Sequence, residues 1–527
     1  MTPLNIRTKF YKTTSFLCTT ALLTALFICC IIEYIVTNKL KWRKQPALSN
    51  KENETKLLPN EKIHFISSTS KFNDERPNLS NSNTQASRIH SQGSSSSVRR
   101  SNNHDQAEEI ANQSTENPYN SIYLAKDDSI SKQISEPTYK LVADLKYYYQ
   151  QYGMDVEKFR IITKDGYELD LWHVIGSSEG EGSKNPVLFI HGLLQSSGSF
   201  ASSGLNSLAY YVSQNLGRDV WLGNNRCGLI PGKRHAEGKK NDDLWDWDLN
   251  EMSKYDLPCL VDYVLKATGK EKLDLIGHSQ GTMQSLQSLI NYKKIDTNFD
   301  NCLLGKVENF VALAPAIYPG SLIYDNVVLR ILASVINSKV IMGTQAFIPL
   351  MMYIRNMSVT FGSKSVFSTL SYLMFKFLFD WNDTLWDKNL KSRHFLFSPV
   401  FVSIKLMQFW LSESKDAVSF KNGKVADLYF PDNKVWFPIV QNESTFASER
   451  PFHVHEPQDL EVYPKMTLFV PKLDKLVDGN RLCNHFTQFE DKRLYQIYYI
   501  DDYSHLDVLW SMDVIEVIGK RIGQALG

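Results

Sequence analysis

The chain divides into three parts by its pattern of hydrophobic and polar positions. Residues 16–36 form an almost uninterrupted apolar run, FLCTTALLTALFICCIIEYIV, whose single charge is Glu33 near its end. As a helix at 1.5 Å per residue, this run spans roughly 31 Å and matches a bilayer core of about 30 Å. A cleaved signal peptide has a shorter apolar region followed by small residues. The pattern therefore favours an uncleaved transmembrane anchor over a signal peptide, with residues 1–15 as an N-terminal tail.

A polar segment follows over residues 37–135. It is rich in Asn, Ser and Glu and contains the run SQGSSSSVRRSNN at 91–103. Such a segment cannot bury enough apolar surface to offset the entropy that it would lose on ordering. We expect a disordered polar linker.

From residue 136 to residue 527, short apolar runs alternate with helical patterns. A hairpin is expected from strands at 159–163 and 168–174, and further strands are expected at 186–191, 219–222, 272–277, 310–315, 466–470 and 494–500. Several of these runs are apolar on both faces, which is typical of a parallel sheet covered by helices on each side. In such sheets ligands bind at the carboxyl ends of the strands. The pattern predicts an α/β domain with its chemistry at that edge.

About 150 residues that the sheet does not require lie between its last predicted strands, at about 316–464. They contain strongly apolar helical patterns at 327–336, 346–354, 370–379 and 397–411. We interpret the insertion as a helical cap whose amphipathic helices rest on lipid and line an apolar pocket. For any single segment, ordinary packing on the core is the alternative.

The charge balance excludes one class of partner. The 58 Lys and Arg residues against 57 Asp and Glu residues give a net charge of +1, which supplies no basic surface for nucleic acid. An apolar fraction of 43% is enough for a large core. The seven cysteines form no CxxC pair, so a structural zinc site is not expected.

The strongest local motif is Gly277-His278-Ser279-Gln280-Gly281. It follows a predicted strand and precedes a predicted helix, as a nucleophile elbow does. Small residues flank the serine in such an elbow because a Cβ at those positions would collide with neighbouring elements. The motif predicts Ser279 as a nucleophile, with an ordinary glycine-containing turn as the alternative. We expect His278 to point away from Ser279 and not to act as the base.

A serine nucleophile needs a histidine base and a carboxylate that orients it. In this type of elbow fold they follow the serine in the order acid, then histidine. Asp474 follows the penultimate predicted strand, with Asp478 as its competitor, and His505 follows the last strand. The competing base, His485, falls within a helical pattern. We predict Ser279, Asp474 and His505 as the catalytic residues.

The third requirement is an oxyanion hole made of two amide donors. One is expected from Gln280, which follows the nucleophile. The loop after the strand at 186–191 reads His191-Gly192-Leu193, and Gly192 permits the close approach that lets the Leu193 amide face the site. A simple turn is the alternative here.

Several longer motifs carry a family resemblance. HGLLQSSGSF, DVWLGNNRCG, YDLPCLVDYVL, GHSQGT and HLDVLW, in this order, resemble the acid lipase family of α/β-hydrolases. With the anchor and the linker, the chain is most similar to the fungal branch, the membrane-anchored steryl ester hydrolases. The resemblance covers about 137–527. Two departures are Cys227, which interrupts the usual NNRG stretch, and the absence of cysteine from the cap insertion, which removes the cap disulfide of secreted relatives.

The resemblance implies an α/β-hydrolase fold and a carboxylic ester hydrolase acting on neutral lipids. Ser279, Asp474 and His505 match the family's triad, and Leu193 and Gln280 match its oxyanion donors. We expect hydrolysis of steryl esters to sterol and fatty acid, without metal or cofactor. The alternatives are a triacylglycerol lipase and a non-catalytic lipid-binding or tethering protein. We expect a single-pass protein at the plasma membrane, the endoplasmic reticulum or the surface of a lipid droplet.

Overall fold

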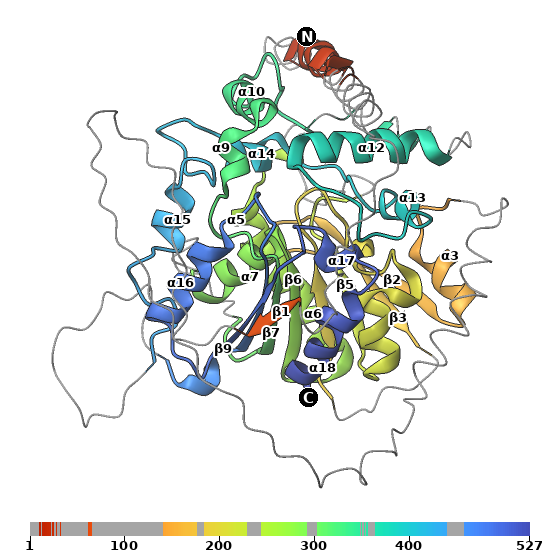
Figure 1. The fold of residues 1–527 in the computed structure, drawn as a ribbon, viewed down its shortest axis with the longest axis vertical. Helices are drawn as coiled ribbons and strands as arrows, with labels where there is room; N and C mark the ends of the chain where they lie inside the picture. The colour runs from red at the N-terminus through yellow and green to blue at the C-terminus, as the bar shows by residue number, and fades with distance from the viewer. Residues whose placement is uncertain are drawn as a thin grey trace, which may run out of the picture. The chain divides into compact units, whose positions relative to one another are not determined.

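A nine-stranded sheet runs through the described part of the protein in a computed structural model (Figure 1). Its strands, in chain order, are β1 (Ile63–Phe65), β2 (Asp155–Ile162), β3 (Glu168–Ile175), β4 (Val187–Ile190), β5 (Val220–Gly223), β6 (Leu273–His278), β7 (Val307–Leu313), β8 (Lys465–Pro471) and β9 (Tyr495–Ile500). Their order across the sheet is β1-β9-β8-β7-β6-β4-β5-β3-β2. The pairs from β5 to β9 are parallel, and β1, β2 and β3 pair antiparallel. The predicted mostly parallel sheet is therefore confirmed.

The structure describes the following residues: 10–11, 13–22, 24–25, 28, 32, 62–65, 141–176, 184–228, 244–291, 303–347, 349, 352–353, 355–356, 364–439 and 458–527. One structural unit comprises 1–72 and 141–527, and a second comprises 73–140. The second unit lies outside the described residues.

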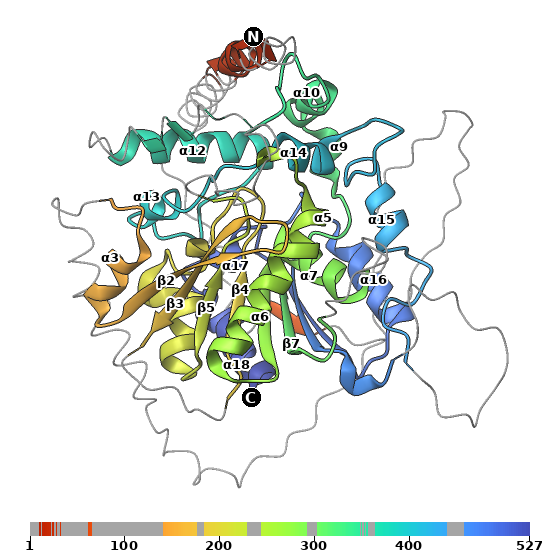
Figure 2. The same ribbon diagram turned by 180° about the vertical axis from the view of Figure 1, so that it is seen from behind.

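The central strands are buried along their whole length, because both faces of the sheet are covered. β4, β5 and β6 read VLFI, VWLG and LDLIGH, and each of their residues is buried. Figure 2 shows α6 (Leu257–Thr268) in front of the sheet, and Figure 1 shows α18 (Lys520–Leu526) in front of the opposite face. The other described α-helices after β1 and outside the insertion between β7 and β8 are α3 (Leu145–Tyr149), α4 (Leu208–Tyr210), α5 (Leu249–Glu251), α7 (Gln280–Ile290), α16 (Gly479–Phe489) and α17 (Asp507–Trp510).

Local sequence sets the limits of α6. Pro258 lies in its first turn, where a missing amide proton costs no helical hydrogen bond. Gly269 ends the helix in the left-handed conformation, with φ of 66°, which favours glycine. Helix α7 differs, because all of its residues are buried, and it begins directly after the elbow serine.

The insertion between β7 and β8 forms a helical cap at one end of the sheet (Figure 1). It contains α9 (Ser321–Asp325), α10 (Val327–Val335), α12 (Lys364–Phe379), α13 (Lys391–His394), α14 (Ile404–Leu411) and α15 (Lys424–Tyr429). The expected helices at 327–336 and 370–379 are present, whereas 346–354 lies partly outside the described residues.

The prediction of a helix at 397–411 is wrong for residues 397–403. Helix α14 begins only at Ile404, because the Ser403 hydroxyl accepts a hydrogen bond from the Leu406 amide at 2.9 Å and caps it. Phe401 and Ser403 instead form isolated bridges with Gly228 and Ala346.

The N-terminal segments differ in part from expectation. Among the residues that the structure describes, no helix has both the length and the apolar character to cross a membrane. Residues 63–65, within the predicted disordered linker of 37–135, form β1 at the edge of the sheet beside β9. The prediction of disorder is therefore wrong for these residues, since IHF provides a short strand with apolar ends that pairs with an open sheet edge. Lys62, directly before β1, is also described, and the other residues of the predicted linker lie outside the described ranges.

Candidate active site

Ser279 lies on a strained turn between β6 and α7. Its φ of 52° and ψ of −115° are rarely adopted by residues other than glycine. A Cβ on Gly281 would lie 2.4 Å from the carbonyl oxygen of Ile190, and a Cβ on Gly277 would lie 3.1 Å from the backbone of Gly281. The two glycines therefore permit the tight passage of the elbow, for the reason that the sequence suggested.

The structure brings the three predicted catalytic side chains into one hydrogen-bonded chain. His505 Nε2 lies 2.7 Å from Ser279 Oγ, and His505 Nδ1 lies 2.6 Å from Asp474 Oδ2. The other oxygen of Asp474 accepts hydrogen bonds from the amides of Leu476 at 2.9 Å and Val477 at 3.4 Å, which fix the carboxylate. All three catalytic side chains are buried or nearly so. This arrangement can remove a proton from a serine hydroxyl and stabilise the resulting imidazolium.

The two competing residues have structural roles. The Asp478 side chain accepts from the Arg481 amide and caps α16. His485 is buried within that helix, stacks on Trp436 with ring centroids 3.7 Å apart, and contacts Glu490 at 3.0 Å. Neither residue reaches Ser279.

The loop that carries Leu193 is held close to the nucleophile. A Cβ on Gly192 would lie 2.8 Å from His278 Nδ1 and 3.2 Å from Ser279 Cβ, so only glycine fits there. The Gly192 amide donates to the side-chain oxygen of Gln195 at 3.1 Å. Leu193 lines the same cavity as Ser279, and Gln280 begins α7 directly after the nucleophile. Both predicted oxyanion residues therefore flank the serine.

His278 joins the two catalytic loops. Its Nδ1 lies 2.9 Å from Gln195 Oε1, and its Nε2 lies 3.1 Å from the backbone oxygen of His505. Burial, together with the neighbouring His505, lowers the pKa of His278 well below its usual value, so the ring is neutral at pH 7. The side chain contacts the backbone of the catalytic histidine and does not bond to Ser279 Oγ, which agrees with the expectation that it is not the base.

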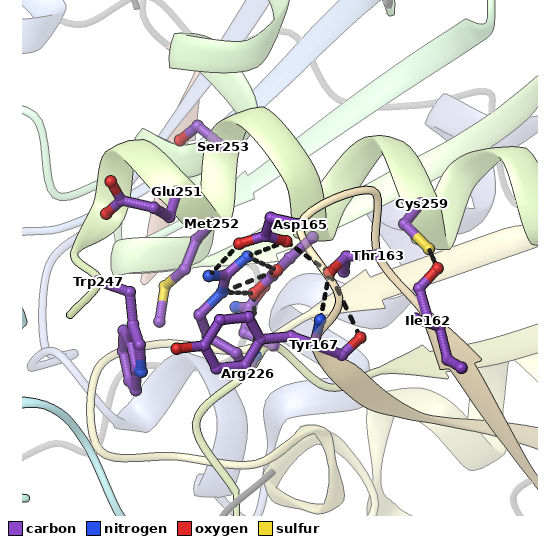
Figure 3. Close-up of polar contacts among 12 residues, drawn as sticks. Ile162, Thr163, Asp165, Tyr167, Arg226, Trp247, Glu251, Met252, Ser253 and Cys259 are labelled. Atoms are coloured by element: carbon purple, nitrogen blue, oxygen red, sulfur yellow. Dashed lines mark hydrogen bonds and ion pairs between the residues drawn. The ribbon is translucent and has the colours of Figure 1, made fainter. Parts of the chain in front are cut away.

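A buried ion-pair cluster holds the NNRC loop behind the site. Figure 3 shows Arg226 beside Asp165 and Tyr167, and its guanidinium also donates to Asp256 at 2.7 Å. In the same loop, Asn225 donates to the Gln284 side chain of α7 at 2.9 Å.

That loop also fixes the histidine at the end of β4. The amide of Asn225 donates to His191 Nε2 at 3.2 Å, so His191 Nδ1 carries the proton and donates to the Gly192 oxygen at 2.9 Å. Burial lowers the pKa of His191 to about 4, which keeps this ring neutral. The NNRC motif thus supports the oxyanion loop, and Cys227, buried beside it, does not interrupt these contacts.

An apolar cavity opens above the triad. Ser279 and His505 lie in its wall together with Leu193. The rest of the wall is mainly apolar and comes largely from the cap, including Leu329, Leu332, Met374, Phe375, Met407 and Leu411. Leu22 and Ala25, from the predicted anchor, also line it. A cavity of this kind binds an apolar molecule with its reacting bond beside the serine.

Two cap tryptophans lie against active-site residues, one at the catalytic histidine and one at Gln280. The Trp381 ring stacks on His505 with centroids 5.9 Å apart and an interplanar angle of 7°. Trp410 Nε1 donates to the side-chain oxygen of Gln280 at 3.0 Å. The sequence contained no signal for either contact, because each joins segments far apart in the chain. Gln195 was missed for a similar reason: a buried, positioning glutamine looks like any polar loop residue in sequence.

In the part of the chain that the structure describes, no group of three or more His, Cys, Asp or Glu side chains is arranged to hold a metal ion.

Comparisons with known proteins place the chain among α/β-hydrolases of the lipase type. Residues 145–204 match the family described as the partial α/β-hydrolase lipase region, and residues 185–307 match the family described as the α/β-hydrolase fold. Sterol esterase 2 of Saccharomyces cerevisiae is 43% identical over 527 residues, which cover 95% of this chain and 94% of that protein. Human gastric triacylglycerol lipase is 24% identical over 389 residues, which cover 70% of this chain and 87% of that lipase.

Proposed function

Because the chain belongs to the acid lipase family of α/β-hydrolases, we propose that it hydrolyses steryl esters to free sterol and fatty acid. The protein is a carboxylic ester hydrolase. The observation that carries the proposal is the hydrogen-bonded chain of Ser279, His505 and Asp474 at the wall of an apolar cavity.

The proposed mechanism is acyl transfer through the serine. Ser279 Oγ attacks the ester carbonyl while His505 Nε2 takes the hydroxyl proton, and Asp474 holds the imidazole through Nδ1. The backbone amides of Leu193 and Gln280 stabilise the oxyanion. His505 then returns the proton to the sterol oxygen as the sterol leaves, and it next activates a water molecule that hydrolyses the acyl-enzyme.

Steryl esters are favoured as the substrate class for two reasons. The relative that matches nearly the whole chain is named a sterol esterase. The cavity wall is apolar and aromatic, which suits a rigid sterol that carries no polar group apart from the ester. The more distant relative named a triacylglycerol lipase makes triacylglycerols the second candidate.

The proposed location is a membrane or the surface of a lipid droplet, with residues 16–36 as a single-pass anchor. The support is the apolar sequence of this segment. The contribution of Leu22 and Ala25 to the cavity wall also agrees with a pocket entrance close to the anchor. Steryl esters are water-insoluble, so an entrance near lipid shortens the path of the substrate. Extraction of membranes at alkaline pH tests this proposal: the full chain should stay in the membrane, and a chain lacking 16–36 should be released.

A substrate panel tests the proposed activity. Purified full-length protein is assayed on a steryl oleate, trioleoylglycerol and a short acyl ester, beside Ser279→Ala. We expect the steryl ester to give the highest kcat/KM and the variant to lose turnover of every substrate. Preference for trioleoylglycerol would favour the second candidate. If wild type and variant behave alike, and a fluorophosphonate labels neither, the protein is a lipid-binding or tethering protein.

A further inference from the structure

A lysine from the N-terminal segment is buried beside the loop that carries the catalytic histidine. Lys62 Nζ lies 2.7 Å from Asp513 Oδ2 and 2.9 Å from Asp502 Oδ2. Lys62 is only 7% exposed. It precedes β1, whereas the two aspartates flank His505 in sequence, so more than four hundred residues separate the partners.

The backbone of the same segment holds that loop as well. Asp501 donates its amide proton to the carbonyl oxygen of Lys62 at 2.8 Å. β1 continues antiparallel to β9, with His64 opposite Tyr499. His64 Nε2 also lies 2.5 Å from a carboxylate oxygen of Asp501. The segment is therefore docked by main-chain and side-chain contacts just before the loop that leads to the catalytic base.

Hydrogen bonds connect Asp513, an aspartate partner of Lys62, to the loop that carries His505 and to the loop that carries Asp474. The second oxygen of Asp513 accepts a hydrogen bond from the Tyr503 hydroxyl at 2.6 Å. The carbonyl oxygen of Tyr503 accepts from the amide of Leu473 at 3.0 Å, next to Asp474. A displacement of the loop at Asp502 or Tyr503 would thus move His505 relative to both of its partners.

The positive charge of Lys62 balances the two carboxylates of Asp502 and Asp513. Burial lowers the pKa of Lys62, but its contacts with Asp513 and Asp502 outweigh burial and raise the pKa above the usual value. Within the described structure, the other oxygen of Asp502 is buried without a hydrogen-bond partner. Without the lysine, two neighbouring carboxylates would lie in a partly buried site with no cation between them, and they would repel each other.

We propose that Lys62 is a positioning residue for His505, so that docking of residues 62–65 at the sheet edge sets the turnover rate of the enzyme. The proposal rests on the triad mechanism but assigns a new role to a segment that precedes the hydrolase domain. Lys62 contacts neither the substrate cavity nor the triad, and it acts through the loop between β9 and His505.

The test compares Lys62→Met with Lys272→Met, which removes a more exposed ion pair, in the full-length protein. Lys272 directly precedes β6, and its Nζ lies 2.6 Å from a carboxylate oxygen of Glu308 in β7. This ion pair is at the end of β6 that is farther from the elbow. We expect Lys62→Met to lower kcat about ten- to a hundredfold with little change in KM, because a small displacement of a catalytic group costs this much. Lys272→Met should retain wild-type kcat. Equal kcat in the two variants would overturn the proposal.

A second change separates positioning from general loss of structure. Asp502→Asn in the Lys62→Met background removes the unbalanced charge, and we expect it to restore part of the lost kcat. Lys62→Arg keeps the charge and should stay within a fewfold of wild type. A double variant that is no faster than Lys62→Met alone, at equal thermal stability, would contradict the charge argument.

A cross-link tests the docking even if Lys62→Met does not fold. In a His64→Cys/Tyr499→Cys chain, the two cysteines are register partners and should form a disulfide, detected as a linked peptide by mass spectrometry. The displaced pair Phe65→Cys/Ile500→Cys should not. Absence of the first link would show that the segment is undocked. In contrast, failure of the triad mechanism itself would appear as activity in Ser279→Ala, with the cross-link intact.

Discussion

The catalytic edge of the sheet and the cap hold their side chains by different forces. At the catalytic edge, buried polar groups are fixed by directional contacts such as the 2.6 Å contact of His505 with Asp474. In the cap, the cavity wall is built from aliphatic and aromatic side chains, which pack by contact area. Directional contacts tolerate little displacement, whereas apolar packing adapts to substitution. Changes at the edge should therefore alter kcat, and changes in the cap should alter KM and substrate preference.

The largest effect is expected at the catalytic carboxylate. Asp474→Asn keeps the shape of the side chain but removes the charge that orients His505 and stabilises its imidazolium. We expect kcat on a steryl ester to fall about 10⁴-fold. Asp478→Asn is the matched control: asparagine caps a helix as well as aspartate does, so activity and thermal stability should stay near wild type. Similar losses in both variants would contradict the assignment of the acid.

A pH experiment should locate at the catalytic edge a part of the folding stability that is present in acid and lost as pH rises. Asp507 accepts from the Ser504 amide at 2.6 Å and from Trp386 Nε1 at 2.7 Å, and burial raises its pKa to about 6. The unfolded value is about 3.9, so between these values the folded protein binds more protons and its stability decreases as pH rises. The decrease attributable to Asp507 is about 2–3 kcal/mol.

Asp507→Asn should remove this component. The measurement is the free energy of unfolding in urea between pH 4 and pH 7, with the exposed cap residue Asp427→Asn as the control. An unchanged slope in the Asp507 variant would mean that other groups dominate the titration.

Trp410 tests whether a cap residue can also affect kcat through the catalytic edge. It belongs to the cap and lines the cavity, but its indole donates to Gln280 beside the nucleophile. Trp410→Phe keeps most of the apolar contact and removes this donor, so we expect kcat to fall about tenfold, which is the usual scale for one hydrogen bond. Phe420→Leu changes the same wall without touching Gln280 and should alter KM alone. If Trp410→Phe changed KM alone, cap residues would affect only KM, and the link from Trp410 to the catalytic edge would be contradicted.

The smallest effect is expected at the rim of the cavity. Val328 is half-buried in α10 and lines the cavity, whereas its neighbour Val327 is 64% exposed and does not. Val328→Ala removes two methyl groups that are only partly shielded, so KM for the steryl ester should rise about threefold with kcat unchanged. Val327→Ala should have no effect in solution assays with detergent-dispersed substrate. A fall in kcat for the Val328 variant would contradict the comparison.

Much of the hydrolase domain could be predicted because its signals are local. Buried parallel strands read as short apolar runs, and β4 to β9 all appear at the expected places. The elbow requires glycine at positions 277 and 281, so the motif could be recognised without knowing the fold. The start of α14 was missed because a serine cap within an apolar run outweighed the continuous hydrophobic pattern.

By itself, the sequence determined the order of elements, the strained serine and the region in which an acid and a base had to be sought, since each depends on neighbouring residues. Strand order already favoured Asp474 over Asp478 and His505 over His485. Only the tertiary structure brought the favoured pair to Ser279, joined Trp410 to Gln280, and docked Lys62 beside the histidine loop. These contacts link residues far apart in the chain, and their existence depends on distances of a few ångströms that no local pattern encodes. The segment at 62–65 is the clearest case, because its short strand is stable only where β9 offers an unpaired edge.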